Sequence, residues 1–383
     1  MAKLNQKTID DVALTLPEDL REHFQWLWGY MTQICGGSRT RLAARLAHVG
    51  HSYDQSSIFK FFTGQLINPK TGQLGAKQAQ NWAEAIQALR DAEKGPLDGR
   101  GIPPVETEVV RLICDAISAI ARPERVCRWL IISGDTGRQK SYGIGWYRAE
   151  NNHSNTIMFE APEKPSPNYL AAEMSSACCG LSTKAYYERI ANIRANLNST
   201  KILIIDNAQR LYNPNSGDRQ DCFSLLQKLQ DEIGFAVVLV FVRNVWSDGS
   251  RTVKVDFVEE MLHGKARGFF SQFIGRIGGA ENVLYLPDET SDADLISFAR
   301  AVGMAEAAAK ICLPLLRWLD RSTGNIRVLL QTLQTAADVA RLEKRVEVRA
   351  SDLCNVVTMD KLDSKERDRL CAIIDRIRNQ EAA

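Results

Sequence analysis

One eight-residue segment constrains the fold of this chain more than any other feature. Residues 129–133 (WLIIS) predict a short buried strand, and the next eight residues read GDTGRQKS. This run follows the pattern G-x-x-x-x-G-K-[ST], in which a tight turn between a strand and a helix presents backbone N–H groups to phosphates. Apolar strands alternate with amphipathic helices after it, so the sequence predicts an α/β domain built on a parallel sheet.

We expect this turn, a P-loop, to bind ATP together with Mg²⁺. Lys140 would reach the β- and γ-phosphates, and the Ser141 hydroxyl would hold Mg²⁺. Gln139 stands where the second glycine of the pattern is expected. A left-handed backbone there costs about 1–2 kcal/mol, and the side chain could crowd the phosphates, so we expect a reduced affinity for nucleotide. The predicted cofactor-binding residues are Gly134, Asp135, Thr136, Gly137, Arg138, Gln139, Lys140 and Ser141.

A second element supports the same site. Residues 201–206 (KILIID) predict a buried strand that ends in Asp206, the Walker B arrangement in which a strand-end carboxylate supports Mg²⁺. Ligands of such sheets bind beyond the carboxyl ends of the strands, so Ser141 and Asp206 are the predicted Mg²⁺ ligands. Asn207 comes next, and an amide cannot accept a proton. We therefore expect slow ATP hydrolysis, or a base supplied from elsewhere.

A third strand ends in a polar residue. Residues 235–242 (FAVVLVFV) predict a buried strand, which Arg243 and Asn244 follow. Two interpretations of Asn244 stay open: a sensor that touches the γ-phosphate, or a strand-terminal residue that only makes a turn. Residues 244–268 resemble an inserted loop.

Two changes in composition divide the chain. Residues 93–104 (EKGPLDGRGIPP) contain three prolines and three glycines, which disfavour both helix and strand and indicate a linker. A second break falls at residues 286–291, and the chain beyond it has apolar residues at helical spacing. The predicted parts are a helix-turn-helix domain at 1–92, a linker at 93–104, an α/β nucleotide-binding domain at 105–288 and a helical domain at 289–383.

Residues 38–64 predict a DNA-binding helix pair. Leu42 and Leu46 give the first helix an apolar face, Gly50 allows a tight turn, and residues 56–62 can form a second helix. That helix would enter the major groove with its N-terminal residues leading. A helical hairpin for protein contacts is the alternative. Tyr53 is expected to be a further exposed reader, and Arg45 adds local positive charge. The predicted DNA-binding residues are Arg39, Arg41, Gln55, Ser56, Ser57 and Lys60.

Composition limits the other classes of function. The net charge is only +2, so a DNA-binding surface must be local. No apolar run approaches the ~20 residues of a membrane span, and the N-terminus has no signal-peptide core, which predicts a cytoplasmic protein. The nine cysteines contain no CxxC, and the five histidines are dispersed, so nothing indicates a zinc site or a metal hydrolase.

The order of these segments resembles the AAA+ ATPases of DNA transposition, the family of the phage Mu B target-selection protein. The resemblance spans about residues 38–340 and implies two further roles. Arg276 matches the arginine finger that reaches the γ-phosphate of a neighbouring subunit, and Arg327 matches the sensor arginine of a helical lid domain. A surface ion pair is the alternative for each. The segments that carry the resemblance are GDTGRQKS, KILIIDNAQRL, FAVVLVFVRN, FFSQFIGRIG and GNIRVLLQTLQTAADVA.

The resemblance also implies a function. Its members form homo-oligomers, as rings or helical filaments, on double-stranded DNA and deliver target DNA to a transposase that stimulates ATP hydrolysis. Two departures put fast turnover in doubt: Asn207 stands where this family usually has glutamate, and Gln139 replaces a glycine. Two alternatives stay open, a non-hydrolysing DNA scaffold ordered by nucleotide and a helix-turn-helix regulator that reads one operator.

Overall fold

The chain folds into two compact units. The computed structural model describes residues 6–35, 37–94, 102–151, 155–164, 166–179, 185–212, 221–243, 256–263, 267–323, 326–357 and 363–382. The first unit comprises Met1–Glu93, Cys114–Ser133 and Gly145–Leu284. The second comprises Lys94–Ile113, Gly134–Ile144 and Tyr285–Ala383. The domain boundaries expected at residues 92, 104 and 288 stay predictions.

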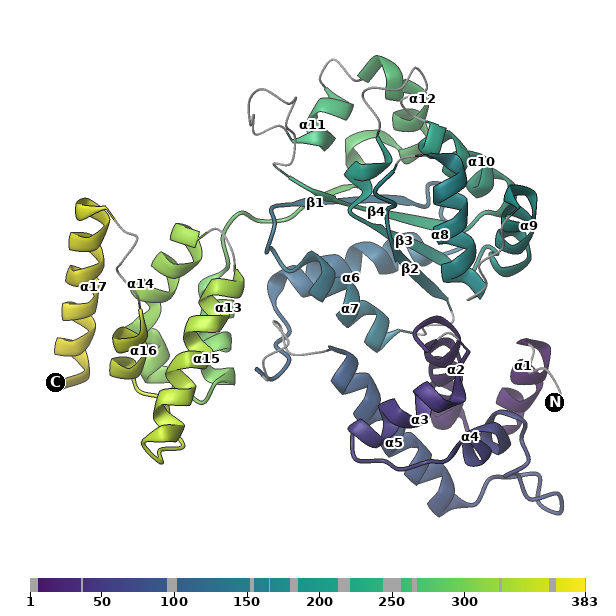
Figure 1. Ribbon diagram of the computed structural model, residues 1–383, viewed down its shortest axis with the longest axis horizontal. Coiled ribbons are helices and arrows are strands. Elements are labelled where there is room, and N and C mark those ends of the chain that lie inside the picture. The colour runs from purple at the N-terminus through teal and green to yellow at the C-terminus, as the bar shows by residue number, and fades with distance from the viewer. Residues whose placement is uncertain are drawn as a thin grey trace. The chain divides into compact units, whose positions relative to one another are not determined.

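A five-stranded parallel sheet organises the α/β part, as the sequence predicts, with the strand order β2-β3-β4-β1-β5 (Figure 1). In the pairing of β2 with β3, Glu160 lies opposite Asp206. Nearly every residue of β1, β3 and β4 is buried, which is typical of parallel strands covered on both faces. The strands are β1 (Trp129–Gly134), β2 (Thr156–Glu160), β3 (Ile202–Asp206), β4 (Ala236–Val242) and β5 (Val283–Tyr285).

Helices cover this sheet. Alternate strand residues such as Leu203 and Val237 pack with α8, α9 and α10 in one apolar core, because successive side chains of a strand point to opposite faces. The helices are α6 (Glu108–Ala121), α7 (Lys140–Glu150), α8 (Pro167–Cys179), α9 (Tyr186–Asn196), α10 (Asp221–Ile233), α11 (Phe257–Leu262) and α12 (Arg267–Ile277), with 3₁₀ turns η1 (Ala208–Leu211) and η2 (Gly279–Asn282).

The expectation that residues 244–268 form a loop is wrong for part of this segment. The side chain of Asp256 accepts hydrogen bonds from the N–H groups of Val258 and Glu259, which starts α11. Phe257 then stacks on Phe241 with ring centroids 5.4 Å apart. An N-cap and a buried aromatic anchor therefore stabilise a short helix inside the predicted loop.

The N-terminal helices share a core rich in aromatic side chains. Phe61 stacks on Trp82, and Phe24 meets both Phe61 and Phe62 edge-on. Gly50 lies between α3 and α4 with φ +88°, a left-handed value that favours glycine. The helices are α1 (Gln6–Thr15), α2 (Glu18–Gln33), α3 (Arg39–His48), α4 (Gln55–Phe62) and α5 (Ala76–Lys94).

Arg90 of α5 bonds the N-terminal helices to the C-terminal end of α7. Arg90 is 6% exposed and donates to the carbonyl oxygens of Ala149, at 2.8 Å, and Glu150, at 2.5 Å. The indole N–H of Trp26 donates to the Arg148 carbonyl at 3.2 Å. The last carbonyls of a helix have no partner within it, and a cation there interacts favourably with the helix dipole. Arg90 therefore both satisfies and caps the end of α7.

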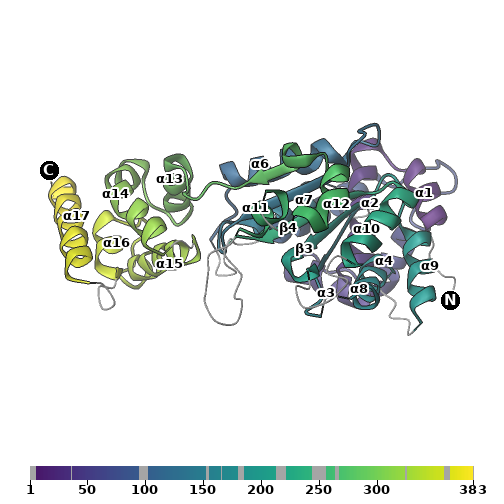
Figure 2. The same ribbon diagram turned by 90° about the horizontal axis from the view of Figure 1, so that it is seen from above.

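The C-terminal helices, shown in Figure 2, form a second apolar core. Leu316, Leu330 and Leu353 are fully buried in it. The helical character predicted for the chain beyond residue 291 is confirmed. Within the described ranges, no helix has the length and apolar character needed to cross a membrane. The helices are α13 (Asp292–Ala301), α14 (Glu306–Thr323), α15 (Ile326–Leu342), α16 (Ala350–Val356) and α17 (Ser364–Ala382).

Candidate nucleotide-binding site

The glycine-containing segment forms the turn between β1 and α7. Gly137 has φ +81° and Gln139 has φ +58°, so two left-handed residues bend the backbone before α7 begins. Lys140, the first residue of α7, is 7% exposed. Its ammonium group donates to the carbonyl oxygens of Gly134, at 2.6 Å, and Asp135, at 2.7 Å. The turn therefore holds the lysine head group against its own backbone.

Gln139 adopts the expected left-handed backbone conformation, and its side chain forms a hydrogen bond with Thr107. The amide oxygen accepts a hydrogen bond from the hydroxyl of Thr107 at 2.8 Å, and both side chains are buried. The same hydroxyl accepts from the backbone N–H of Val110 in the first turn of α6. This bond offsets part of the conformational cost and removes the reason to expect the amide to crowd phosphate.

Arg138 links the turn to α14. Its guanidinium bonds Asp320 at 2.8 Å, and the two side chains are 7% and 2% exposed. Asp320 also accepts from the backbone N–H and the hydroxyl of Thr290. A buried charge needs such partners. Sequence reasoning missed Asp320 because no local pattern relates it to the turn.

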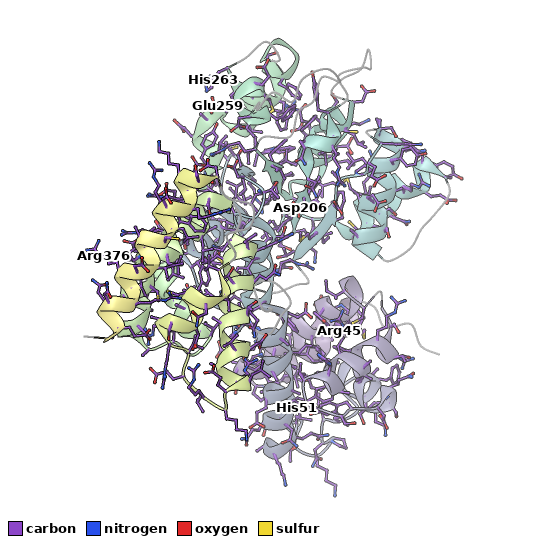
Figure 3. The ribbon with its side chains drawn as sticks, turned by 60° about the vertical axis from the view of Figure 1, so that its left-hand side comes forward. Arg45, His51, Asp206, Glu259, His263 and Arg376 are labelled. Atoms are coloured by element: carbon purple, nitrogen blue, oxygen red, sulfur yellow. The ribbon has the colours of Figure 1, made fainter. Side chains whose placement is uncertain are left out.

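Two acids end neighbouring strands, and sequence reasoning found only one of them. Asp206, labelled in Figure 3, ends β3, and Glu160 ends β2. Asn207 has φ +54°, and its side-chain N–H donates to Oε1 of Glu160 at 2.7 Å. Arg210 pairs with the same oxygen at 2.8 Å. The strand TIMFE ends in an acid just as ILIID does, and that shared pattern was the available signal.

The chemistry of these groups fits Mg²⁺ and a nucleotide. Mg²⁺ takes oxygen ligands and is usually bound by one or two carboxylates together with substrate phosphates. The Ser141 hydroxyl and the Asp206 carboxylate supply such oxygens, and the Lys140 ammonium supplies the positive charge for a phosphate. In the chain, Lys140 and Ser141 follow β1, and Asp206 is the last residue of β3.

Comparison with known families agrees with this geometry. Residues 124–247 match the model of the family described as "AAA domain", and this range contains both the turn and Asp206. The chain contains an AAA-type ATPase domain. Such a domain binds nucleotide, usually with Mg²⁺. A search of curated proteins finds no match to the sequence.

Several solved structures are similar to this chain. The RuvB Holliday junction branch migration motor of Thermotoga maritima has a TM-score of 0.42 at 17% identity, covering 70% of this chain and 76% of that chain. The Orc1 protein of Aeropyrum pernix, solved in complex with DNA, has a TM-score of 0.44 at 16% identity, covering 70% and 68%. Drosophila ORC bound to DNA has a TM-score of 0.47 at 12% identity, covering 73% and 67%. These low values carry no argument about function.

The other residues predicted to act at the nucleotide site are Asn244, Arg276 and Arg327. Asn244, at the end of the range matched to the AAA domain, lies outside the described residues. Arg276 is half-exposed near the end of α12 and pairs closely with Asp231 of α10. Arg327 is exposed in the first turn of α15. The arginine-finger and sensor roles of these residues stay predictions.

The helix pair α3–α4 presents most of the predicted DNA contacts. The exposed ones are Arg41, Gln55, Ser56 and Lys60, while Ser57 and Arg39 are half-buried. The Arg39 guanidinium lies over the ring of Phe59, 5.0 Å from its centroid. The expectation that Tyr53 is an exposed reader is wrong. Its ring stacks on Trp82 with centroids 4.0 Å apart, and its hydroxyl donates to the Asn81 carbonyl.

An acid and a cavity complete this surface. Asp54 caps α4 by accepting from the Ser57 N–H at 2.6 Å, and this hydrogen bond lowers the pKa of the carboxyl. Asp54 is therefore charged at neutral pH, at the end of α4 predicted to approach DNA. An open cavity of about 550 Å³ lies along α3, where it brings three basic side chains together. The lining residues are Ile34, Cys35, Arg41, Ala44, Arg45 and His48.

Proposed function

We propose that this protein binds ATP with Mg²⁺ in its AAA domain and thereby controls its own binding to double-stranded DNA. One helix carries the proposal. α7 begins with Lys140 and Ser141 of the P-loop, and its last carbonyls accept hydrogen bonds from Arg90 of the N-terminal helices. Because α7 is one continuous helix, a change at the phosphate-binding turn can reach the N-terminal helices through it.

The roles of the site residues follow from their chemistry. When ATP binds, the Lys140 ammonium would give up its hydrogen bonds to the two loop carbonyl oxygens. It would bond the β- and γ-phosphate oxygens of ATP instead. Ser141 and Asp206 would hold the metal, which neutralises charge on the phosphates. Arg276 would leave Asp231 to reach the γ-phosphate of a neighbouring copy, and Arg327 would contact ATP from the C-terminal helices. The arginine finger requires a homo-oligomer.

The finer function rests on the resemblance to the ATPases of DNA transposition. We infer that the protein assembles as a ring or helical filament on DNA and delivers that DNA to a transposase. In this proposal residues 1–92 bind DNA, 93–104 are a linker, 105–288 bind nucleotide and 289–383 form the lid. Asn207 supports a second candidate, a scaffold that uses ATP only to order its oligomer, because an amide cannot act as a base.

Binding of the full chain to unrelated DNA duplexes tests the proposal. Affinities are measured with ATP, with ADP and without nucleotide at one stated salt concentration, because phosphate contacts make binding depend on salt. We expect tight binding to every duplex only with ATP. Lys140→Ala should abolish the effect of ATP, whereas Lys310→Ala, on the exposed face of α14, should preserve it.

Three outcomes separate the candidates. Binding that ignores nucleotide in the wild-type chain contradicts the proposal. A requirement for one DNA sequence favours an operator-reading regulator. ATP-dependent binding without any hydrolysis favours the scaffold.

A further inference from the structure

Glu160 is held in place beside the Walker B residues. Its Oε1 atom accepts from the Asn207 side-chain amide at 2.7 Å and from the Arg210 guanidinium at 2.8 Å. The register of the parallel pair β2–β3 puts Glu160 opposite Asp206. Two donors on one oxygen fix the orientation of the carboxylate, while its side chain stays 57% exposed and accessible to water.

Among the described strands, the terminal residues offer few candidates for a base. Among the described strands, β2 and β3 end in an acid, whereas β1, β4 and β5 end in Gly134, Val242 and Tyr285. Asp206 is engaged as the proposed metal ligand. Asn207 can donate and accept hydrogen bonds but cannot take up a proton at neutral pH. Glu160 is therefore the strand-end carboxylate left for proton transfer.

We propose that Glu160 is the general base for ATP hydrolysis, displaced from β3 to the neighbouring strand. This inference rests on the proposed function. In the step, Oε2 of Glu160 accepts a proton from water while the water oxygen bonds to the γ-phosphorus. The bond from the γ-phosphorus to the bridging oxygen breaks, and its electron pair leaves with ADP. Inorganic phosphate is the second product, and Glu160 returns its proton to solvent.

Asn207 and Arg210 are positioning residues in this arrangement. Both contact Oε1, which directs Oε2 away from them as the proton acceptor. The amide of Asn207 in turn accepts from the Gln209 side chain at 3.2 Å, and Gln209 accepts from the Val242 N–H at the end of β4. A chain of hydrogen bonds therefore connects the ends of β2, β3 and β4.

The test measures ATP turnover by the full-length protein with DNA, together with binding of a fluorescent ATP analogue. Glu160→Gln keeps the shape of the side chain and removes its basicity. We expect kcat to fall about 100-fold or more, with the affinity for the analogue unchanged within about twofold. The matched control is Glu163→Gln, an exposed acid three residues further along the chain, which should leave kcat unchanged.

The outcomes distinguish this inference from the proposed function. A Glu160→Gln protein that hydrolyses ATP at nearly the wild-type rate overturns the inference. So does a wild-type chain that binds ATP and DNA but never hydrolyses ATP, and in that case ATP-dependent DNA binding still stands. A wild-type chain that does not bind the analogue removes both.

Discussion

At the residue scale, Gln139 combines a conformational cost with a compensating contact. Its backbone is left-handed, which an L side chain adopts at a cost of about 1–2 kcal/mol, and its amide bonds Thr107 in a buried setting. Replacing it by Gly or by Ala removes the same hydrogen bond. The difference between these two variants therefore isolates the backbone term.

We expect Gln139→Gly to be more stable than Gln139→Ala by about 1 kcal/mol, because glycine adopts positive φ without strain. For a chain of 383 residues, the difference should appear as a higher midpoint of thermal unfolding, by about 1 °C. Circular dichroism melts without nucleotide check it. Equal midpoints would show that the turn relaxes to another conformation when the side chain is lost.

The sequence predicts the backbone conformation of P-loop residues such as Gln139 better than it predicts which side chains they contact. The conserved geometry of the pattern G-x-x-x-x-G-K-[ST] is enough to infer a left-handed residue at position 139. It says nothing of Thr107 or Asp320, because tertiary packing alone brings these residues to the turn. Tyr53 was misplaced for the same reason, since its stacking on Trp82 depends on how α5 packs.

At the scale of elements, α7 connects two parts of the molecule with different chemistry. The strands β1, β3 and β4 follow from apolar runs that the sequence shows, whereas β2, β5 and α11 were not predicted. The fastening of α7 was not, because Arg90 lies 59 residues before Ala149 and nothing in its local sequence indicates a cap. Long-range polar contacts of this kind decide how elements are joined.

The Arg90→Leu variant should change both the free energy of unfolding and the effect of ATP on DNA affinity. It removes the donor to the buried carbonyl of Ala149, and we expect a loss of about 1–3 kcal/mol in the free energy of unfolding. ATP should also affect DNA affinity less in this variant, while the affinity for ATP itself changes little. Arg341→Leu, on the exposed face of α15, is the control and should cost under about 0.5 kcal/mol. Full retention of both properties in Arg90→Leu would contradict the role given to α7.

At the scale of the whole molecule, the net charge is small, and residues 38–64 carry an excess of positive charge. The chain carries a net charge of +2, whereas residues 38–64 contain four basic side chains and one acidic one. A surface of this kind attracts the DNA backbone without reading its sequence, because phosphate contacts supply most non-specific affinity. The sequence predicts this patch directly, since surface charge needs no tertiary partner.

Two substitutions on α4 should therefore change DNA binding in opposite directions. Lys60→Ala removes one phosphate contact and should reduce the slope of log affinity against log salt concentration by about 0.9 on every duplex. Asp54→Asn keeps an N-capping side chain and removes a negative charge, so it should tighten binding to every duplex. Lys365→Ala on α17 serves as the control and should leave the slope unchanged. Fluorescence anisotropy titrations at several salt concentrations measure both effects, and a slope that ignores Lys60 would place the DNA-binding surface away from α4.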